Sequence, residues 1–192
     1  MKKFKIKINF KVKIILLVLF ILLLFVVIFG IIGKKASSSP KQLVKGYMKQ
    51  YQIEDKAVTS KIKYAFQDKL NSEQEKRYKE IIKKQYRRLK YTIEDSYIGD
   101  IEANFSINFT VVDLKSEYDR ANSYVLSHQD KFSNGDGEID TKKAINYKLE
   151  KMEEAEEIVE YTITITCYKD KNGDWNISYP SATDIAKLQG IF

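Results

Sequence analysis

The sequence is poor in the residues that provide covalent cross-links and catalytic groups. Its 192 residues include one cysteine, one histidine and two prolines. A single cysteine excludes an internal disulfide, so the fold must depend on packing alone. Because that residue is Cys167, we also expect no lipid anchor on a cysteine near the N-terminus.

Acidic residues are missing from residues 1–35, which contain eight lysines. The whole chain has 33 basic and 26 acidic side chains, and its formal net charge of +7 would ordinarily suggest a nucleic-acid partner. Residues 36–192 alone have 25 basic and 26 acidic side chains. The excess charge therefore belongs to the N-terminal segment, where it suits anionic lipid headgroups, and we expect no nucleic-acid partner.

Charged and hydrogen-bonding side chains are also missing from Ile14–Ile32. A helix of this length is about 28 Å long at about 1.5 Å per residue, close to the thickness of the bilayer hydrocarbon. We therefore predict a transmembrane helix over residues 14–33, in contact with membrane lipid. Six lysines precede it and two follow it directly, which predicts a cytoplasmic N-terminus over residues 1–13 and an extracellular remainder in a protein of the cell membrane.

A cleaved signal peptide is the alternative interpretation of this segment, because signal peptides also begin with lysines. Their apolar regions usually have about 7–15 residues and end at a site of small residues. Here the apolar run is longer and is followed by Gly33, Lys34 and Lys35. A retained anchor is therefore the prediction, followed by a linker over residues 34–39.

Residues 40–192 are predicted to form one extracytoplasmic α+β domain, and its first part is helical. The segment from Ser39 to Gln42 has the pattern of a capping box with a proline in the first turn. A second helix is predicted from the spacing of Val58, Ile62, Ala65, Phe66 and Leu70. Ser72 and Glu75 predict the capping box of a third helix.

Two β-hairpins are predicted from alternating apolar and polar residues. The first combines residues 91–98 with a strand whose inward residues are Phe105, Ile107, Phe109 and Val111. In the second, the inward residues before the Asn172-Gly173 turn are Val159, Tyr161, Ile163, Ile165 and Cys167. The strand after the turn contains Trp175, Ile177 and Tyr179. The closing segment is expected to dock on the sheet through Ile185, Leu188 and Phe192.

Two further helices are predicted between the hairpins. Their expected buried residues are Tyr118, Ala121, Val125, Phe132, Ile145, Leu149, Met152 and Ala155. The loop between them, Asn134–Asp140, resembles part of an EF-hand. In that register positions 1 and 12 would be Phe132 and Lys143, which cannot bind calcium. We therefore expect a plain loop with Asp140 or Thr141 as the next helix cap.

Two of the predicted helices carry opposite charge. The basic residues of the third helix and its end are Lys76, Arg77, Lys79, Lys83, Lys84, Arg87, Arg88 and Lys90. The acidic residues of the helix before the last hairpin are Glu150, Glu153, Glu154 and Glu157. A solvated helix face is favoured for the acids over a metal or acid–base site. The opposite charges also predict a weak, salt-sensitive contact between copies, or an orientation toward an anionic partner such as a wall polymer.

The other candidate reactive residues do not predict a catalytic or metal site. His128 lies at the margin of an apolar helical face, and Cys167 faces inward on a predicted strand, where cysteine behaves as a small hydrophobe. The sequence contains no Gly-x-Ser-x-Gly pattern and no phosphate-binding glycine loop. We therefore expect no catalytic residue, no cofactor, no metal ligand and no enzymatic activity.

The order of elements, with helices, a hairpin, a helical insertion and a closing hairpin, resembles the nuclear transport factor 2-like (cystatin-like) α+β family. The closing strand, Gly173-Asp174-Trp175-Asn176-Ile177, is similar to that of small exported members from Gram-positive bacteria. The resemblance covers residues 40–192. It implies an antiparallel sheet that is strongly bent and wraps the helices into a cone, sometimes with a pocket.

The predicted function is that of a membrane-anchored extracytoplasmic binding or assembly module, with a protein or a second copy of the chain as partner. A subunit of a type IV secretion or conjugation channel is one alternative, because such subunits share this topology. An exported enzyme with a cone pocket is the other. Two or more buried carboxylates in a pocket would favour the enzyme, and a pocket lined by Tyr and Ile would favour binding.

Overall fold

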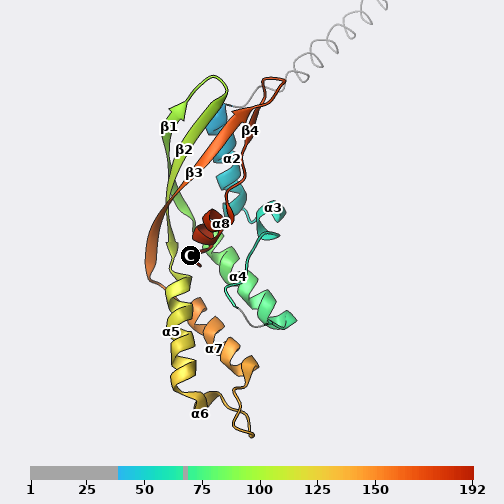
Figure 1. The fold of residues 1–192 in the computed structure, drawn as a ribbon, viewed down its shortest axis with the longest axis vertical. Coiled ribbons are helices and arrows are strands. Elements are labelled where there is room, and N and C mark those ends of the chain that lie inside the picture. Colours follow the sequence, from blue (N-terminus) through green and yellow to red (C-terminus); the bar gives the residue numbers. More distant parts are fainter. Residues whose placement is uncertain (1–38, 67–68) are drawn as a thin grey trace, which may run out of the picture. The chain divides into compact units, whose positions relative to one another are not determined.

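Four antiparallel strands form the centre of the structure, a computed structural model that describes residues 39–66 and 69–192 (Figure 1). They are β1 (Lys90–Ile98), β2 (Glu102–Val112), β3 (Ile158–Lys169) and β4 (Trp175–Ile177), and they neighbour one another in this order. Both predicted hairpins are confirmed, as β1 with β2 and as β3 with β4. The long pairing of β2 with β3 joins the two hairpins into one sheet. The α+β class and the antiparallel sheet are therefore as predicted.

The inward face of the sheet follows the predicted alternation of apolar and polar residues. Phe105, Ile107 and Phe109 of β2 are at most 2% exposed, and their partners Ile163 and Ile165 of β3 are equally buried. Because successive side chains of a strand point to opposite faces, a register shift of one residue would expose all of them. The hydrophobic pattern therefore fixes the pairing of the two long strands.

Strand β4 is shorter than the sequence predicts. It pairs with only the last three residues of β3 and ends at Ile177. The backbone N–H of Ser178 still donates to the carbonyl of Thr166 at 2.8 Å, but Pro180 lacks the N–H group that would continue the ladder. Tyr179, which the alternation assigns to the strand, is 72% exposed.

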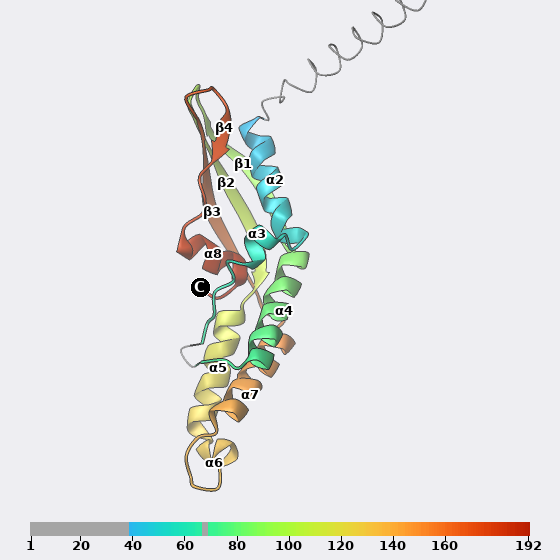
Figure 2. The same cartoon turned by 90° about the vertical axis from the view of Figure 1, so that its right-hand side faces the viewer.

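Helices α2 (Pro40–Gln52) and α4 (Ser72–Arg88) pack on the inward face of the sheet (Figures 1 and 2). Helix α2 begins with the predicted capping box, in which Ser39 Oγ accepts from the backbone N–H of Gln42. The buried residues that these helices contribute include Val44, Tyr47, Met48, Tyr51, Tyr78, Ile81, Ile82 and Tyr86. Four tyrosines thus lie in the core together with the aliphatic side chains.

The capping box of α4 lies one residue before the predicted one. Asn71 is the N-cap, and its Oδ1 accepts the backbone N–H groups of Glu73 and Gln74, both at 3.0 Å. Gln74 returns the bond, because its Oε1 accepts the backbone N–H of Asn71 at 3.1 Å. The prediction from Ser72 and Glu75 is wrong because the preceding asparagine and glutamine satisfy the same pattern and make the bonds.

The predicted second helix is wrong for most of its length. Only α3 (Lys56–Thr59) forms a helical turn, and the described residues between it and α4 are not helical. The backbone N–H of Lys63 donates to Gln189 Oε1 at 3.3 Å, and that of Ala65 donates to the hydroxyl of Tyr78 at 3.2 Å. Tertiary partners thus replace the bonds that a helix would supply. The predicted apolar residues of the segment that are buried are Val58, Ile62, Phe66 and Leu70.

A helical hairpin is inserted between β2 and β3. It consists of α5 (Leu114–Ser127), the short α6 (Gln129–Phe132) and α7 (Thr141–Glu154), with α5 and α7 side by side (Figure 1). Asp140 caps α7 by accepting the backbone N–H of Lys143 at 3.1 Å, as predicted. Within the insertion, Val125, Phe132 and Ala144 form a separate apolar cluster.

The chain closes with α8 (Ala182–Gln189). Leu188 joins the main core and is fully buried, whereas Phe192 is 56% exposed, so the predicted docking is carried mainly by Leu188. The helix ends at Gly190, which has a φ of 68° and whose carbonyl accepts the backbone N–H of Lys115 at 2.9 Å. A Cβ atom at this position would overlap the carbonyl of Val112, so both the backbone conformation and the space require glycine.

Ser39–Phe192 forms one compact unit. The predicted span over residues 14–33 lies outside the described residues. Among the helices of residues 39–66 and 69–192, none combines the length and apolar character needed to cross a membrane.

Candidate functional site

An open groove of about 650 Å³ lies where the end of α4 meets the end of β2 and the start of β3. A smaller pocket of about 30 Å³ adjoins it below the first turn of α5 and the last turn of α7. The residues that line both are Gln85, Arg88, Val112 and Ala155. The groove takes its side chains from the end of α4 and from β1, β2 and β3, so it is the candidate site.

Gln85 closes the sheet edge beside the groove. Strand β2 extends past the start of β1. The first residue of β1, Lys90, pairs with Thr110, so Val112 of β2 has no partner on β1. The side chain of Gln85 supplies the missing bonds. Its Oε1 accepts the backbone N–H of Val112 at 2.8 Å, and its Nε2 donates to the carbonyl oxygens of Val112 at 2.9 Å and Gln189 at 3.0 Å. One buried amide thus fixes the relative positions of α4, β2 and α8.

The groove has a basic rim and a partly apolar floor. Its exposed cations are Lys84, Arg87, Arg88 and Lys90, of which Lys84 lines the adjoining pocket. Arg87 forms an ion pair with Glu54, whereas the other three form no ion pair with another described residue. The apolar residues of the groove are Leu89, Val111, Val112, Ala155 and Ile158. Glu156 is the one acidic residue that lines the groove, so cations outnumber acids there. Ile158 is 69% exposed, so the rim places an excess of positive charge next to exposed apolar surface.

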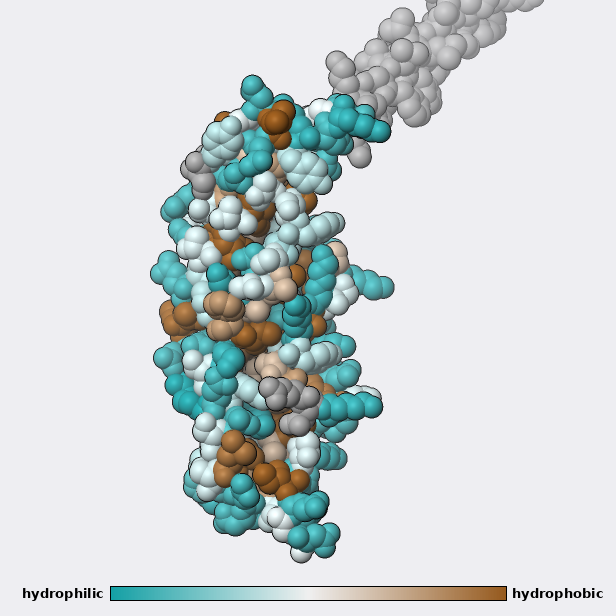
Figure 3. Space-filling model, viewed as in Figure 1, coloured by the Kyte–Doolittle hydropathy of each residue, from teal (hydrophilic) through white to brown (hydrophobic). Residues whose placement is uncertain are grey.

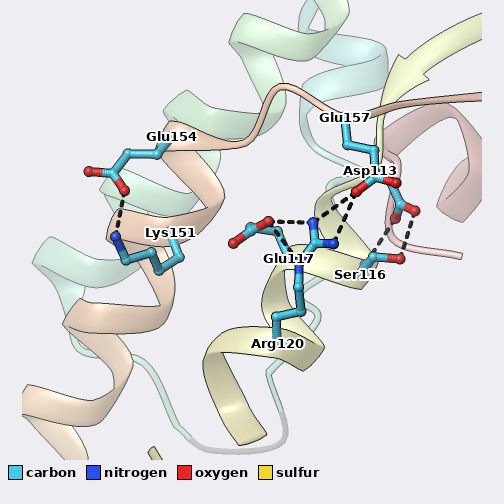
Figure 4. Close-up of polar contacts among 7 residues, drawn as sticks. All are labelled: Asp113, Ser116, Glu117, Arg120, Lys151, Glu154 and Glu157. Carbon is cyan, nitrogen blue, oxygen red and sulfur yellow. Dashed lines mark hydrogen bonds and ion pairs between the residues drawn. The ribbon is translucent and has the colours of Figure 1, made fainter. Parts of the chain in front are cut away.

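The four glutamates singled out in the sequence do not converge on one site. Glu157 lies beside Arg120, which also contacts Glu117, and Glu154 pairs with Lys151 (Figure 4). Glu153 pairs with Arg77, and Glu150 is exposed. The structure therefore distributes these carboxylates over separate surface ion pairs, as expected for a solvated helix face.

The basic and acidic helices meet within the chain. The guanidinium of Arg77 on α4 donates to both carboxylate oxygens of Glu153 on α7, at 2.6 Å each. Next to this pair, Gln74 Nε2 donates to Asn146 Oδ1 at 2.9 Å. The opposite charges that predicted a contact between copies are thus partly paired inside one copy. Among the α4 cations without an ion pair to a described residue, Lys84 and Arg88 lie further along the helix, at the groove and its adjoining pocket, whereas Lys76 and Lys79 lie outside them.

The loop Asn134–Asp140 is a hydrogen-bonded turn. Asn134 N–H donates to the carbonyl of Glu138 at 2.8 Å, and Gly137 N–H donates to the carbonyl of Asn134 at 3.1 Å. Gly137 has a φ of 83°, a conformation that favours glycine. Within residues 39–66 and 69–192, no three His, Cys, Asp or Glu side chains are grouped so that they could hold a metal ion. The loop is therefore closed by its own backbone hydrogen bonds, and Asp140 caps the next helix.

His128 and Cys167 have the surroundings that the sequence suggested. His128 is half-buried at the end of α5, where its ring stacks on Tyr124 at a centroid distance of 4.0 Å and its Nδ1 lies 3.0 Å from the carbonyl of Tyr124. Cys167 is fully buried, its Sγ lies 3.6 Å from the carbonyl of Pro40, and burial raises the pKa of its thiol. Both residues are accounted for by packing.

The cations of the groove are evident in the sequence, whereas the role of Gln85 was not predicted. The available signal was a polar residue on the apolar stripe of α4, one turn after Ile81 and Ile82 and one turn before Leu89. Buried polar side chains are normally hydrogen-bonded, so such a residue marks a specific partner. The partner itself, the unpaired end of β2, is set by the different lengths of two strands and is not visible in the sequence.

Comparisons with known proteins identify neither a family nor a curated relative. No protein-family model matches the chain, and no curated protein matches it. Among solved structures, the chain is similar to YcdA, a candidate lipoprotein from Bacillus subtilis subsp. subtilis strain 168, with 15% sequence identity and a TM-score of 0.43. The similarity covers 78% of this chain and 46% of that protein, so the chain matches less than half of its length. A similarity this weak does not indicate a function.

Proposed function

We propose that the chain is a single-pass protein of the cell membrane whose extracellular domain is a non-catalytic binding module for an anionic partner. The anchor is the apolar segment over residues 14–33, with residues 1–13 in the cytoplasm. The partner binds in the groove between α4, β2 and β3. The groove supports this proposal more directly than any other feature. Arg88 and Lys90 line it, and Lys84 lines the adjoining pocket, without ion-pair partners among the described residues. Glu156 is the one acidic residue of the groove lining, so positive charge is in excess beside the apolar floor.

The chemistry of the groove favours a partner that combines an anionic group with an apolar portion. Exposed cations attract an anion over several ångströms, although salt weakens this attraction. A partner that covers the apolar floor removes exposed apolar surface, such as that of Ile158, from water. This contribution to binding is not weakened by salt. An acidic protein segment or a phosphate-containing wall polymer has both properties.

The nuclear transport factor 2-like cone is part of this proposal. Its support is the order of elements, with α2 and α4 before the first hairpin, the insertion α5–α7, and a closing hairpin that carries Gly173 and Trp175.

A charge-reversal pair tests the binding proposal. The full chain is placed in nanodiscs of zwitterionic lipid, and binding of sodium polyphosphate and of poly-L-glutamate is measured by calorimetry. Lys84→Glu with Arg88→Glu is expected to weaken binding by about tenfold or more, equivalent to about 1.4 kcal/mol. The matched control is Lys76→Glu with Lys79→Glu, which changes two exposed cations of the same helix outside the groove.

The control decides between a site and a general charge effect. Binding that falls equally in both variants would contradict a site at the groove, since it would depend only on net charge. If the unaltered chain binds neither polymer, the proposal that its partner is anionic is contradicted. A loss confined to the groove variant supports the proposal.

A further inference from the structure

Two hairpin tips of the domain carry exposed apolar and aromatic side chains. Tyr97, Ile98 and Ile101 at the turn between β1 and β2 are 57%, 56% and 74% exposed, and Tyr168 near the end of β3 is 47% exposed. The tips are adjacent, because the backbone N–H of Lys169 donates to the carbonyl of Ile101 at 2.8 Å. These four side chains therefore lie at the same end of the sheet, and together we call them the tip surface.

The tip surface lies at the end of the domain where α2 begins (Figures 1 and 2). Cys167, the residue before Tyr168, places its Sγ 3.6 Å from the carbonyl of Pro40, the first residue of α2. Figure 3 shows apolar surface at this end of the domain. The start of the domain and the tip surface are thus neighbours within the same unit.

A short segment limits how far this end can lie from a membrane. Only residues 34–39 separate the predicted span from Pro40. A chain of six residues reaches at most about 20 Å when fully extended, at about 3.3–3.6 Å per residue. The headgroup layer itself is about 5–7 Å thick on each side of the hydrocarbon. If the span crosses the bilayer, the tip surface is held within reach of the lipid interface.

We propose that the tip surface rests in the interfacial layer of the bilayer that holds residues 14–33, with Tyr97, Ile98, Ile101 and Tyr168 as the inserted side chains. This inference depends on the membrane anchor of the proposed function. Tyrosine and tryptophan are enriched at this depth because one part of each side chain is apolar and another part is polar. Trp175 lies beside the tips, with Lys169 Nζ 5.0 Å from its ring centroid.

Apolar contact rather than charge favours the bilayer here. The tips carry Lys169 and Lys171, but also Asp100, Glu102, Asp170 and Asp174, so they offer no excess of positive charge. Asp170 is already used in the turn, where it accepts the backbone N–H of Asn172 at 2.8 Å. The contact should therefore persist in high salt and on zwitterionic lipid, unlike binding at the groove.

Trp175 provides a natural probe of this contact, because it is the only tryptophan of the chain. The full chain is placed in nanodiscs of zwitterionic lipid, with or without bromine atoms near the top of the acyl chains. Bromine quenches tryptophan fluorescence at short range. We expect a loss of Trp175 emission in the brominated discs, at low salt and at about 0.5 M salt, where the Debye length is about 4 Å.

Two double variants test whether the contact is made by the tips. Ile98→Ser with Ile101→Ser should restore the emission toward its unbrominated value. The matched control is Ile53→Ser with Leu126→Ser, since these residues are 59% and 55% exposed. Ile53 is the C-cap of α2, at the end of that helix away from the tips, and Leu126 lies on α5. The control should be quenched as strongly as the unaltered chain.

The remaining outcomes of the quenching experiment each contradict one part of the proposal. Emission that is equal in both kinds of disc, with the chain still bound to them, overturns the tip contact and leaves the anchor intact. Quenching that both variants leave unchanged overturns the assignment to Ile98 and Ile101. Failure of the full chain to co-purify with the discs overturns the anchor, and with it both proposals.

Discussion

The two apolar clusters of the domain differ greatly in make-up. The main core joins the sheet to α2, α4 and α8, and its side chains on β2 and β3 are almost completely buried. The outer cluster lies within the α5–α7 insertion and has only Val125, Phe132 and Ala144 as buried members. Around them, Tyr124 and Tyr147 are half-buried and stacked at a centroid distance of 5.3 Å.

This difference indicates where stability and adaptability lie. Hydrophobic stabilisation grows with the apolar area removed from water, so the sheet and its helices should hold the fold while the outer end of the insertion opens more easily. The groove lies at the junction, lined by Gln85 from α4 and by Ala155 at the end of α7, and the adjoining pocket adds Leu114 and Met152 from the base of the insertion. A partner in the groove would contact the rigid part and the base of the less stable part.

Alkaline pH should have the largest effect on the main core. Burial raises the pKa of Tyr86 to about 12, and it raises the pKa values of Tyr51 and Tyr78 as well. Below about pH 10 these tyrosines are protonated in both states, so they add no pH dependence. Between about pH 10 and 12 the unfolded chain loses protons that the folded chain keeps, so stability falls as pH rises.

The expected slope is about 1.4 kcal/mol per pH unit for each tyrosine, or about 4 kcal/mol per unit for the three. Urea unfolding at a series of pH values measures it. Tyr86→Phe should lower the slope by about 1.4 kcal/mol per pH unit. An unchanged slope in that variant would show that Tyr86 does not titrate as its burial indicates.

Removing a ring from the main core should be the next largest effect. Phe105→Ala leaves a cavity in the middle of β2 and should lower the free energy of unfolding by about 3–5 kcal/mol. Phe192→Ala is the matched control, because Phe192 is 56% exposed and should change stability by about 0.5 kcal/mol or less. Denaturant unfolding compares the two, and similar losses would contradict the assignment of the core.

The sequence predicted the main core well because its signal is local. On β2 and β3, strict alternation can be satisfied only by a sheet with one buried face. The predicted inward residues of β2 are buried, as are Ile163, Ile165 and Cys167 of β3, while Val159 and Tyr161 are partly buried against the core. The segment with Ile62 and Phe66 is different. Its apolar spacing suits a helix, but its backbone donors bind Gln189 and Tyr78, which lie far away in sequence. Such contacts cannot be read from local spacing.

The candidate site was predictable only in part, for the same reason. The basic residues Lys84, Arg88 and Lys90 are evident in the sequence, but their gathering at a groove depends on where β1 starts and where β2 ends. The acidic residues were also evident. Whether they would converge could not be predicted, because their partners Arg77 and Arg120 come from other helices.

The junction between the two regions can be tested at Gln85. Gln85→Leu leaves the backbone N–H and carbonyl of Val112 without their partner and should cost about 1–3 kcal/mol. Hydrogen exchange at the Val112 amide should accelerate in parallel. Gln52→Leu is the control, since it removes a single bond to the carbonyl of Leu89. Equal effects of both changes would contradict a special role for Gln85.

The smallest effect is expected in the outer cluster. Phe132→Ala should lower global stability by about 1–2 kcal/mol, less than Phe105→Ala, because its surroundings are already half-exposed. Amide exchange should accelerate at the adjoining ends of α5 and α7 and stay slow in β2. Faster exchange in β2 to the same extent would show that the two clusters open together, which would remove the contrast between them.

The extracellular position of the domain is the premise on which both the groove and the tip surface depend. It is tested most directly by adding protease to intact protoplasts of a Gram-positive host that makes the full chain with an epitope tag at each end. The account predicts that the C-terminal tag is lost and that the N-terminal tag survives on a short membrane-bound fragment. Survival of the C-terminal tag until the membrane is permeabilised would place the domain inside the cell and contradict the account.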